Sequence, residues 1–187
     1  RHWREGFSAY ELAWNWVEAN GVPPPVRQAL DACPGYRGVE LVEGFFEREV
    51  DLRTRGRRSQ TDLMALLRTD GGYAVLAVEG KVEEPFGPLV RDWRDGSPDR
   101  ERRLGTLCAV LGLDPDAVSG LRYQLLHRAV SAVFEAQRYG CGRAMLLVHA
   151  FSSKRTSFPD FSAFSEALGV PARRGRACVR RQAVRRR

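Results

Sequence analysis

Two long apolar runs in the middle of the chain are the clearest structural signal in the sequence. Residues 61–68 and 73–82 are nearly continuous in apolar side chains, and the letters TDGG between them supply the glycines of a tight turn. We predict that they form an antiparallel hairpin. Because the runs do not alternate apolar with polar residues, both strands are expected to be covered on their two faces.

Helical periodicity brackets this hairpin. Apolar residues recur at helical spacing from Ser8, a candidate N-cap, to the breaker pair Asn20 and Gly21. Further helices are predicted over residues 26–32, 97–113, 122–139 and 158–169, and a fourth strand over 143–151. Residues 38–54 are mixed and favour a helix end followed by a strand over 47–53. The order of elements predicts a mixed α/β sheet with helices on both faces, in one domain over residues 1–170.

Length and composition narrow the class of protein. The 187 residues suit a single domain, and no apolar run approaches the length of a membrane span. The basic start of the chain lacks the apolar segment of a secretory signal. The four cysteines are scattered without a C-x-x-C pair, which argues against a zinc site and favours free thiols in a reducing compartment. A cytoplasmic protein with no membrane partner is therefore expected.

The net charge of +7 suggests a polyanionic partner, but the location of the charge weakens that inference. Residues 171–187 contain eight arginines and no acid, so the rest of the chain carries 7 − 8 = −1. We expect this arginine-rich tail to be disordered; it either binds phosphate backbones without sequence preference or has no specific role.

Charged residues stand at the ends of both central apolar runs. Glu79 and Lys81 are two residues apart and therefore share a face of their strand, and a hairpin brings Asp62 beside them. Two carboxylates held that close repel each other unless a proton or a cation intervenes, and carboxylate oxygens suit Mg²⁺ or Mn²⁺. Such a metal activates water and neutralises charge on a phosphodiester under attack. The alternative is a structural ion pair of Glu79 with Lys81, with Asp62 capping a turn.

Lysine is rare in this chain, which adds weight to Lys81. Of thirty basic residues, only Lys81 and Lys154 are lysines. A lysine in an arginine-rich background suggests a site that requires a compact ammonium group rather than a planar guanidinium.

The stretch TDLMALLRTDGGYAVLAVEGKV resembles the core motif of the PD-(D/E)XK nuclease superfamily, which has the restriction-endonuclease-like fold. The likeness extends over roughly residues 8–169 to a bacterial subgroup of that superfamily, although Thr61 stands where the motif has proline. The resemblance implies Asp62, Glu79 and Lys81 as catalytic residues. It further implies metal ligation by Asp62, Glu79 and the carbonyl of Gly80.

Three further groups of residues are candidates for the same site. Relatives often add a glutamate from the first helix, for which Glu11 is preferred over Glu18, although both are also ordinary surface acids. In the helix over 122–139, a polar stripe of Gln124, Arg128, Ser131 and Glu135, with His127 beside it, either contacts substrate or is the polar side of an amphipathic helix. Arg57 and Arg58 precede the hairpin and are candidates to guide a polyanion.

Two functions remain in competition on the sequence alone. The leading hypothesis is a Mg²⁺- or Mn²⁺-dependent nuclease that acts on DNA or RNA. The alternative is a non-catalytic binding or interaction module of the same fold. Outside residues 171–187 the net charge is close to zero, which argues against nucleic acid binding. The presence of Asp62, Glu79 and Lys81 together favours catalysis. The sequence leaves a homodimer open.

Overall fold

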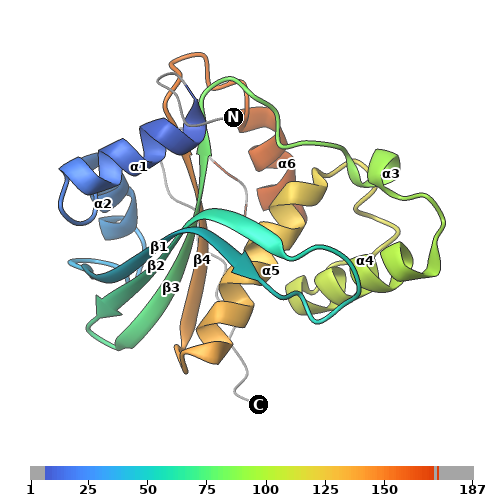
Figure 1. The fold of residues 1–187 in the computed structure, drawn as a ribbon, viewed down its shortest axis with the longest axis horizontal. Coiled ribbons are helices and arrows are strands. Elements are labelled where there is room, and N and C mark those ends of the chain that lie inside the picture. The colour runs from blue at the N-terminus through green and yellow to red at the C-terminus, as the bar shows by residue number, and fades with distance from the viewer. Residues whose placement is uncertain (1–6, 171, 173–187) are drawn as a thin grey trace.

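The computed structural model describes residues 7–170 and 172, which form a four-stranded mixed sheet flanked by helices (Figure 1). The elements in chain order are α1 (Ser8–Glu18), α2 (Pro24–Asp31), β1 (Glu40–Val50), β2 (Ser59–Thr69), β3 (Gly72–Lys81), α3 (Val90–Trp93), α4 (Pro98–Leu111), α5 (Tyr123–Arg138), β4 (Arg143–Ala150) and α6 (Phe158–Ala167). The predicted α/β class and the predicted order of helices and strands are confirmed.

The strands lie in the order β1-β2-β3-β4. The first three form an antiparallel meander, and β4 joins β3 in parallel after the crossover through α5. In the central hairpin, Leu63 pairs with Val78 and Thr69 pairs with Gly72. The φ angle of Gly72 is 105°, a value that favours glycine, so the TDGG sequence makes the turn that its composition predicts.

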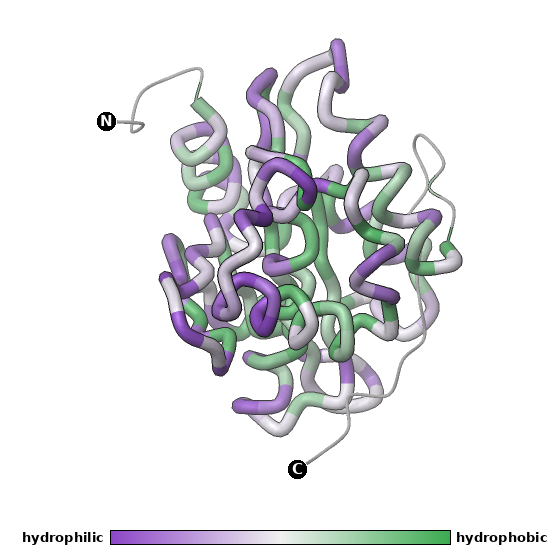
Figure 2. The backbone as a smooth tube through the Cα atoms, turned by 90° about the vertical axis from the view of Figure 1, so that its right-hand side faces the viewer, coloured by the Kyte–Doolittle hydropathy of each residue, from purple (hydrophilic) through white to green (hydrophobic). Residues whose placement is uncertain are grey.

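Helices cover both faces of the sheet, as predicted. On one face, Leu12 and Trp16 of α1 and Leu30 of α2 form a buried cluster with alternate residues of β2 and β3, including Leu63 and Val78. On the other face, α4 and α5 form a second buried cluster with the intervening residues of the same strands. Figure 2 shows the hydrophobic stretches of the chain gathered at the centre, between more hydrophilic segments. The continuous apolar runs of β2 and β3 therefore follow from burial on both faces.

Three predicted boundaries need correction, and one short helix is not predicted. β1 spans Glu40–Val50, where the sequence suggests a helix end and a later strand; its many charged residues are tolerated because it is the exposed edge strand. Ser8 lies inside α1 and Phe7 is the N-cap residue, without a side-chain cap. The second helix begins at Pro24, because proline is accepted in a first turn. The short helix α3 is not predicted at all.

Other sequence expectations concern the cysteines, the membrane and the tail. Cys33, Cys108 and Cys141 are buried free thiols, as expected. Within residues 7–170, no helix combines the length and the apolar character needed to cross a bilayer. The prediction of a disordered tail over residues 171–187 lies, apart from residue 172, outside the described residues.

Candidate functional site

Asp62, Glu79 and Lys81 lie together at one end of the hairpin, on the sheet face that packs against α5. Strand alternation puts Asp62 on the face of Met64, and Glu79 and Lys81 on the face of Ala77, both of which belong to the α5-side core. The backbone ladder between β2 and β3 stops at Leu63 and Val78. Beyond it, the backbone N–H of Gly80 donates to Oδ2 of Asp62 over 2.8 Å. The end of β3 therefore lies beside the start of β2, as predicted.

Glu79 is held by three donors. Its Oε1 accepts hydrogen bonds from Nζ of Lys81 at 3.0 Å and from Nε2 of Gln124 at 2.6 Å. Its Oε2 accepts from Nε of Arg128 at 2.6 Å. Only 2% of Glu79 and 4% of Lys81 is exposed, so the carboxylate is buried but fully hydrogen-bonded. A buried charge is tolerated under these conditions, because its partners replace the hydration that it loses.

The predicted polar stripe of α5 faces the sheet. Gln124 and Arg128 contact Glu79, and Glu135, the last polar side chain of the stripe, accepts from Arg48 of β1 at 3.0 Å. Arg128 and Glu135 are buried. The helix is covered on both sides, since its apolar residues belong to the core shared with α4. An ordinary amphipathic helix with a solvated polar face is therefore excluded for α5.

Ser59 and His127 extend the hydrogen-bond network away from the sheet. The Nη1 atom of Arg128 donates to Oγ of Ser59 at 3.1 Å, and the same hydroxyl lies 2.8 Å from Nδ1 of His127. Burial lowers the pKa of His127 well below its usual value, and Arg128 and Arg103 lower it further. The imidazole is therefore neutral at physiological pH. It is linked to Glu79 through Arg128, whose Nη1 lies 3.5 Å from Nδ1 of His127 and also donates to Ser59.

The carboxyl group of Asp62 has an unusual affinity for protons. Burial raises its pKa to about 7, and the nearby charge of Glu79 acts in the same direction. The Gly80 N–H, Arg128 and Lys81 oppose this rise without cancelling it. Asp62 and Glu79 thus interact as the repelling pair that the sequence predicts, and a cation between them would relieve the repulsion.

The oxygen donors at this corner fit a hard divalent cation. Oδ1 of Asp62 has no hydrogen-bond partner among residues 7–170, and Glu79 supplies a second carboxylate. The carbonyl of Gly80 faces the same side as its N–H, toward Asp62. Two carboxylates and one carbonyl suit Mg²⁺, which normally retains waters and binds substrate phosphate in its other positions. Glu79 would have to exchange one of its present donors for the metal.

Glu11 is not brought into this group. It lies on α1, which packs on the sheet face opposite α5, and its neighbours Ser8 and Leu12 approach Gly80 from that side. In the described part of the chain, no three His, Cys, Asp or Glu side chains are close enough together to hold a metal. A third protein carboxylate from Glu11 stays a prediction without support in this arrangement.

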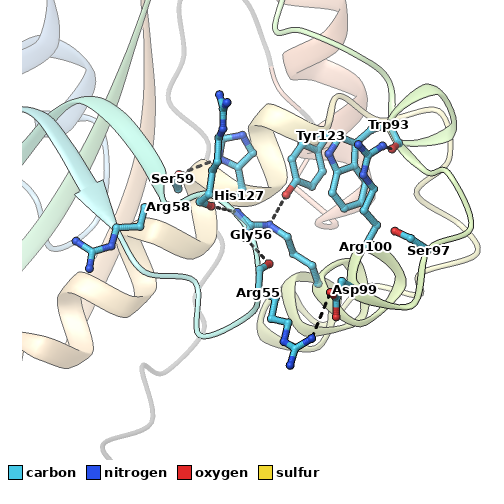
Figure 3. Close-up of a pocket in the computed structure, with 12 residues that line it drawn as sticks. Arg55, Gly56, Arg58, Ser59, Trp93, Ser97, Asp99, Arg100, Tyr123 and His127 are labelled. Atoms are coloured by element: carbon cyan, nitrogen blue, oxygen red, sulfur yellow. Dashed lines mark hydrogen bonds and ion pairs between the residues drawn. The ribbon is translucent and has the colours of Figure 1, made fainter.

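Arg57 and Arg58 belong to the loop between β1 and β2, which extends from the sheet to α4 (Figure 1). They line a pocket of about 540 Å³ that begins beside Ser59 and His127 (Figure 3). The pocket is lined by Arg55, Gly56, Arg57, Arg58, Ser59, Trp93, Ser97, Asp99, Arg100, Arg103, Tyr123 and His127. The two arginines therefore lie next to the hydrogen-bond network of Glu79, and among residues 7–170 their side chains share no hydrogen bond or ion pair with it.

Ser59, Trp93 and Arg103 are site residues that the sequence analysis misses. Ser59 is three residues from Asp62, and regular alternation would place the two on opposite faces. The neighbouring strand β1 is kinked at Glu47, whose φ is 53°, and beyond the kink Arg48 and Val50 both turn toward α5. No local pattern signals this twist. Arg103 and Trp93 come from α4 and α3, and only the tertiary structure brings them to the loop.

Comparison with known proteins places the chain in a family but adds no function. Neither the curated proteins nor the solved structures contain a significant match. A family model matches residues 1–185, which is nearly the whole chain. The chain therefore belongs to the family described as domain of unknown function DUF6946.

Proposed function

We propose that this protein is a metal-dependent nuclease that hydrolyses phosphodiester bonds of nucleic acid at the end of the β2–β3 hairpin. The observation that supports it is the convergence of Asp62, Glu79 and Lys81 on one face, with Gly80 hydrogen-bonded to Asp62. Two carboxylates beside a buried lysine are costly as structure alone, because the carboxylates repel and every charge must be desolvated. They suit a site that binds a cation and a phosphate.

Each residue of the cluster has a distinct part in this proposal. Asp62 and Glu79, with the Gly80 carbonyl, would hold Mg²⁺ or Mn²⁺, which supplies Lewis-acid neutralisation of the charge that develops on the phosphate. The ammonium of Lys81 lies 3.0 Å from Glu79 and adds a positive charge at the same corner. It would donate hydrogen bonds to the phosphate or to the attacking water.

Residues of α5 keep the cluster in place. Arg128 and Gln124 fix opposite oxygens of Glu79, so its carboxylate cannot rotate away from Asp62. Ser59 in turn fixes the guanidinium of Arg128. This second layer of hydrogen bonds is the kind of support that a preorganised catalytic site requires.

A non-catalytic binding module is the second candidate, and one observation favours it. Both oxygens of Glu79 already accept hydrogen bonds from protein donors, as in a purely structural ion-pair network. If that network is the whole role of the cluster, the protein binds nucleic acid or another partner without cleaving it.

A nuclease assay with two lysine variants separates these functions. The chain should cleave fluorescent single- or double-stranded DNA or RNA in millimolar Mg²⁺ or Mn²⁺. Replacing the buried lysine by Lys81→Met should lower the rate at least about 100-fold, because a preorganised donor to the phosphate is lost. The matched control is Lys154→Met, which removes the only other lysine, an exposed residue paired with Glu83. Equal rates for all three proteins would rule out Lys81 and reject the mechanism.

Metal binding is tested without reference to activity. Millimolar Mg²⁺ or Mn²⁺ should raise the melting temperature, because a ligand of the native state stabilises it, and Asp62→Ala should abolish the rise. Absence of both cleavage and a metal-dependent shift would support the binding module instead. Melting curves of each metal-free variant verify that it remains folded.

A further inference from the structure

The pocket beside the Glu79 network combines flat aromatic rings with unpaired positive charge. Trp93 of α3 and Tyr123 of α5 are stacked, with ring centroids 3.9 Å apart and planes 8° from parallel. The guanidinium of Arg100 lies over the Trp93 ring at 5.3 Å, and His127 lies against Tyr123 at 4.9 Å. These groups form one wall of the pocket in Figure 3.

The opposite wall is the loop between β1 and β2, and Arg103 holds it in place. This buried guanidinium donates to the carbonyls of Arg55 at 3.3 Å and Arg57 at 2.7 Å, and to the hydroxyl of Tyr123 at 2.6 Å (Figure 3). Gly56, at the centre of the loop, has φ of 110°, a conformation that other residues rarely adopt. The loop is thus fixed by specific bonds to Arg103 of α4, which is itself bonded to Tyr123 of α5, and the loop presents a defined surface.

The charge of the pocket is strongly positive. Five arginines and one acid line it, and that acid, Asp99, accepts from Arg102 at 2.9 Å and lies 3.9 Å from Arg55. Within the described chain, the exposed side chains of Arg57 and Arg58 form no hydrogen bond or ion pair. Two such guanidiniums beside an aromatic wall are suited to a nucleotide. The arginines can bind its phosphate, and the aromatic wall can contact its flat base.

We propose that this pocket binds one nucleotide unit of a nucleic acid strand. Arg57 and Arg58 bind its phosphate, and its base lies against the wall formed by Trp93 and Arg100. The volume of 540 Å³ falls within the usual range for small-molecule sites. The choice of a nucleic acid as ligand rests on the proposed function. The inference adds a specific site, next to the hydrogen bonds of Glu79, that holds an unpaired or terminal nucleotide.

Calorimetric titration with thymidine 3′,5′-bisphosphate in EDTA tests the pocket without metal or cleavage. The wild-type protein should bind this probe and should bind thymidine much more weakly. Arg57→Ala and Arg58→Ala should each weaken binding about ten-fold, since each removes a charge-assisted hydrogen bond donor. The matched control, Arg37→Ala, removes an exposed arginine from the loop between α2 and β1 and should bind as wild type does. Trp93→Leu should weaken binding of the bisphosphate more than that of inorganic phosphate, because only the former has a base.

The outcomes separate this inference from the proposed nuclease. Lys154→Met should bind the bisphosphate as tightly as wild type, since Lys154 is exposed and lies outside the pocket. Arginine-dependent binding in a protein that never cleaves would support the pocket and reject the nuclease. Failure of wild type to bind, or equal losses in Arg57→Ala and Arg37→Ala, would overturn the pocket and leave the nuclease assay as the test of Lys81.

Discussion

At the scale of single residues, Asp62 is the carboxylic acid whose ionisation most affects both the stability of the fold and the proposed metal site. Its carboxyl group is half-buried and lies beside another acid, and its pKa is raised to about 7. The folded protein therefore retains a proton between about pH 4 and pH 7 that the unfolded chain has released. This residue contributes most to stability below pH 4, and the contribution is lost as the pH rises through 7. A carboxylate retained at such a position is typical of a functional site.

Removing the charge of Asp62 should stabilise the metal-free protein at alkaline pH. Asp62→Asn retains an oxygen that accepts from the N–H of Gly80 but cannot ionise. In EDTA at pH 8, we expect an increase of about 1–3 kcal/mol in the free energy of unfolding, with a smaller increase at pH 5. Urea denaturation at both pH values measures it. The control Asp70→Asn changes an exposed turn residue and should have little effect; a loss of stability in Asp62→Asn at pH 8 would contradict the assigned cause of the raised pKa.

At the scale of elements, the site depends on two helices that contact β3 from opposite faces. The α5 helix reaches Glu79 with Gln124 and Arg128. The α1 helix lies against Gly80, where a Cβ atom would be 3.0 Å from the carbonyl oxygen of Ser8 and 3.4 Å from Cβ of Leu12. Glycine between Glu79 and Lys81 therefore allows close packing of α1 on the strand that carries both charges.

A methyl group at Gly80 should displace α1. Gly80→Ala is expected to lower the free energy of unfolding by about 1–3 kcal/mol, because the obstructing atoms belong to backbone and to a buried helix face. Gly105→Ala is the matched control: it lies inside α4, and its Cβ would meet nothing within 4 Å. There, alanine should be stabilising by about 0.5–1 kcal/mol through its helix propensity. Urea denaturation compares the two, and equal stability of Gly80→Ala and wild type would refute the close packing.

At the scale of the whole molecule, positive charge is distributed unevenly. The eight arginines of residues 171–187 account for more than the entire net charge of +7. In the rest of the chain, acids pair with many arginines, for example Glu101 with Arg94 and Asp160 with Arg122. The pocket formed by α3, α4, α5 and the loop before β2 is a local exception. If the protein binds nucleic acid as we propose, long-range attraction and local recognition would therefore come from different parts of the chain.

Replacing the tail arginines should weaken nucleic acid binding without altering the site. When all eight are changed to glutamine, the slope of log affinity against log salt for duplex DNA should fall in magnitude by up to about 7, because fewer counterions are released. Fluorescence anisotropy over a series of salt concentrations measures this slope. Binding of thymidine 3′,5′-bisphosphate should not change. An unaltered salt slope would show that the tail takes no part in binding.

Much of the candidate site follows from local sequence. Spacing alone places Glu79 and Lys81 on one face, and the TDGG turn makes Asp62 their neighbour across the hairpin. These features are predictable because strand alternation and turn geometry depend on residues close together in the chain. The helical periodicity likewise predicts the polar stripe with Gln124 and Arg128. It does not predict that the stripe contacts Glu79. The first part of β1 is predicted as a helix end rather than as strand, because the charged side chains of an exposed edge strand do not alternate regularly with apolar ones.

The sequence by itself therefore determines the order of elements, the hairpin and the carboxylate pair beside a lysine. Only the tertiary structure decides that Arg128 and Gln124 clamp Glu79 and that Ser59 turns toward α5. It also decides that Arg103 fixes the loop of Arg57 across 46 residues of sequence. The physical reason is that these contacts join residues far apart in the chain, whose meeting depends on how two faces of the sheet are packed rather than on any local periodicity.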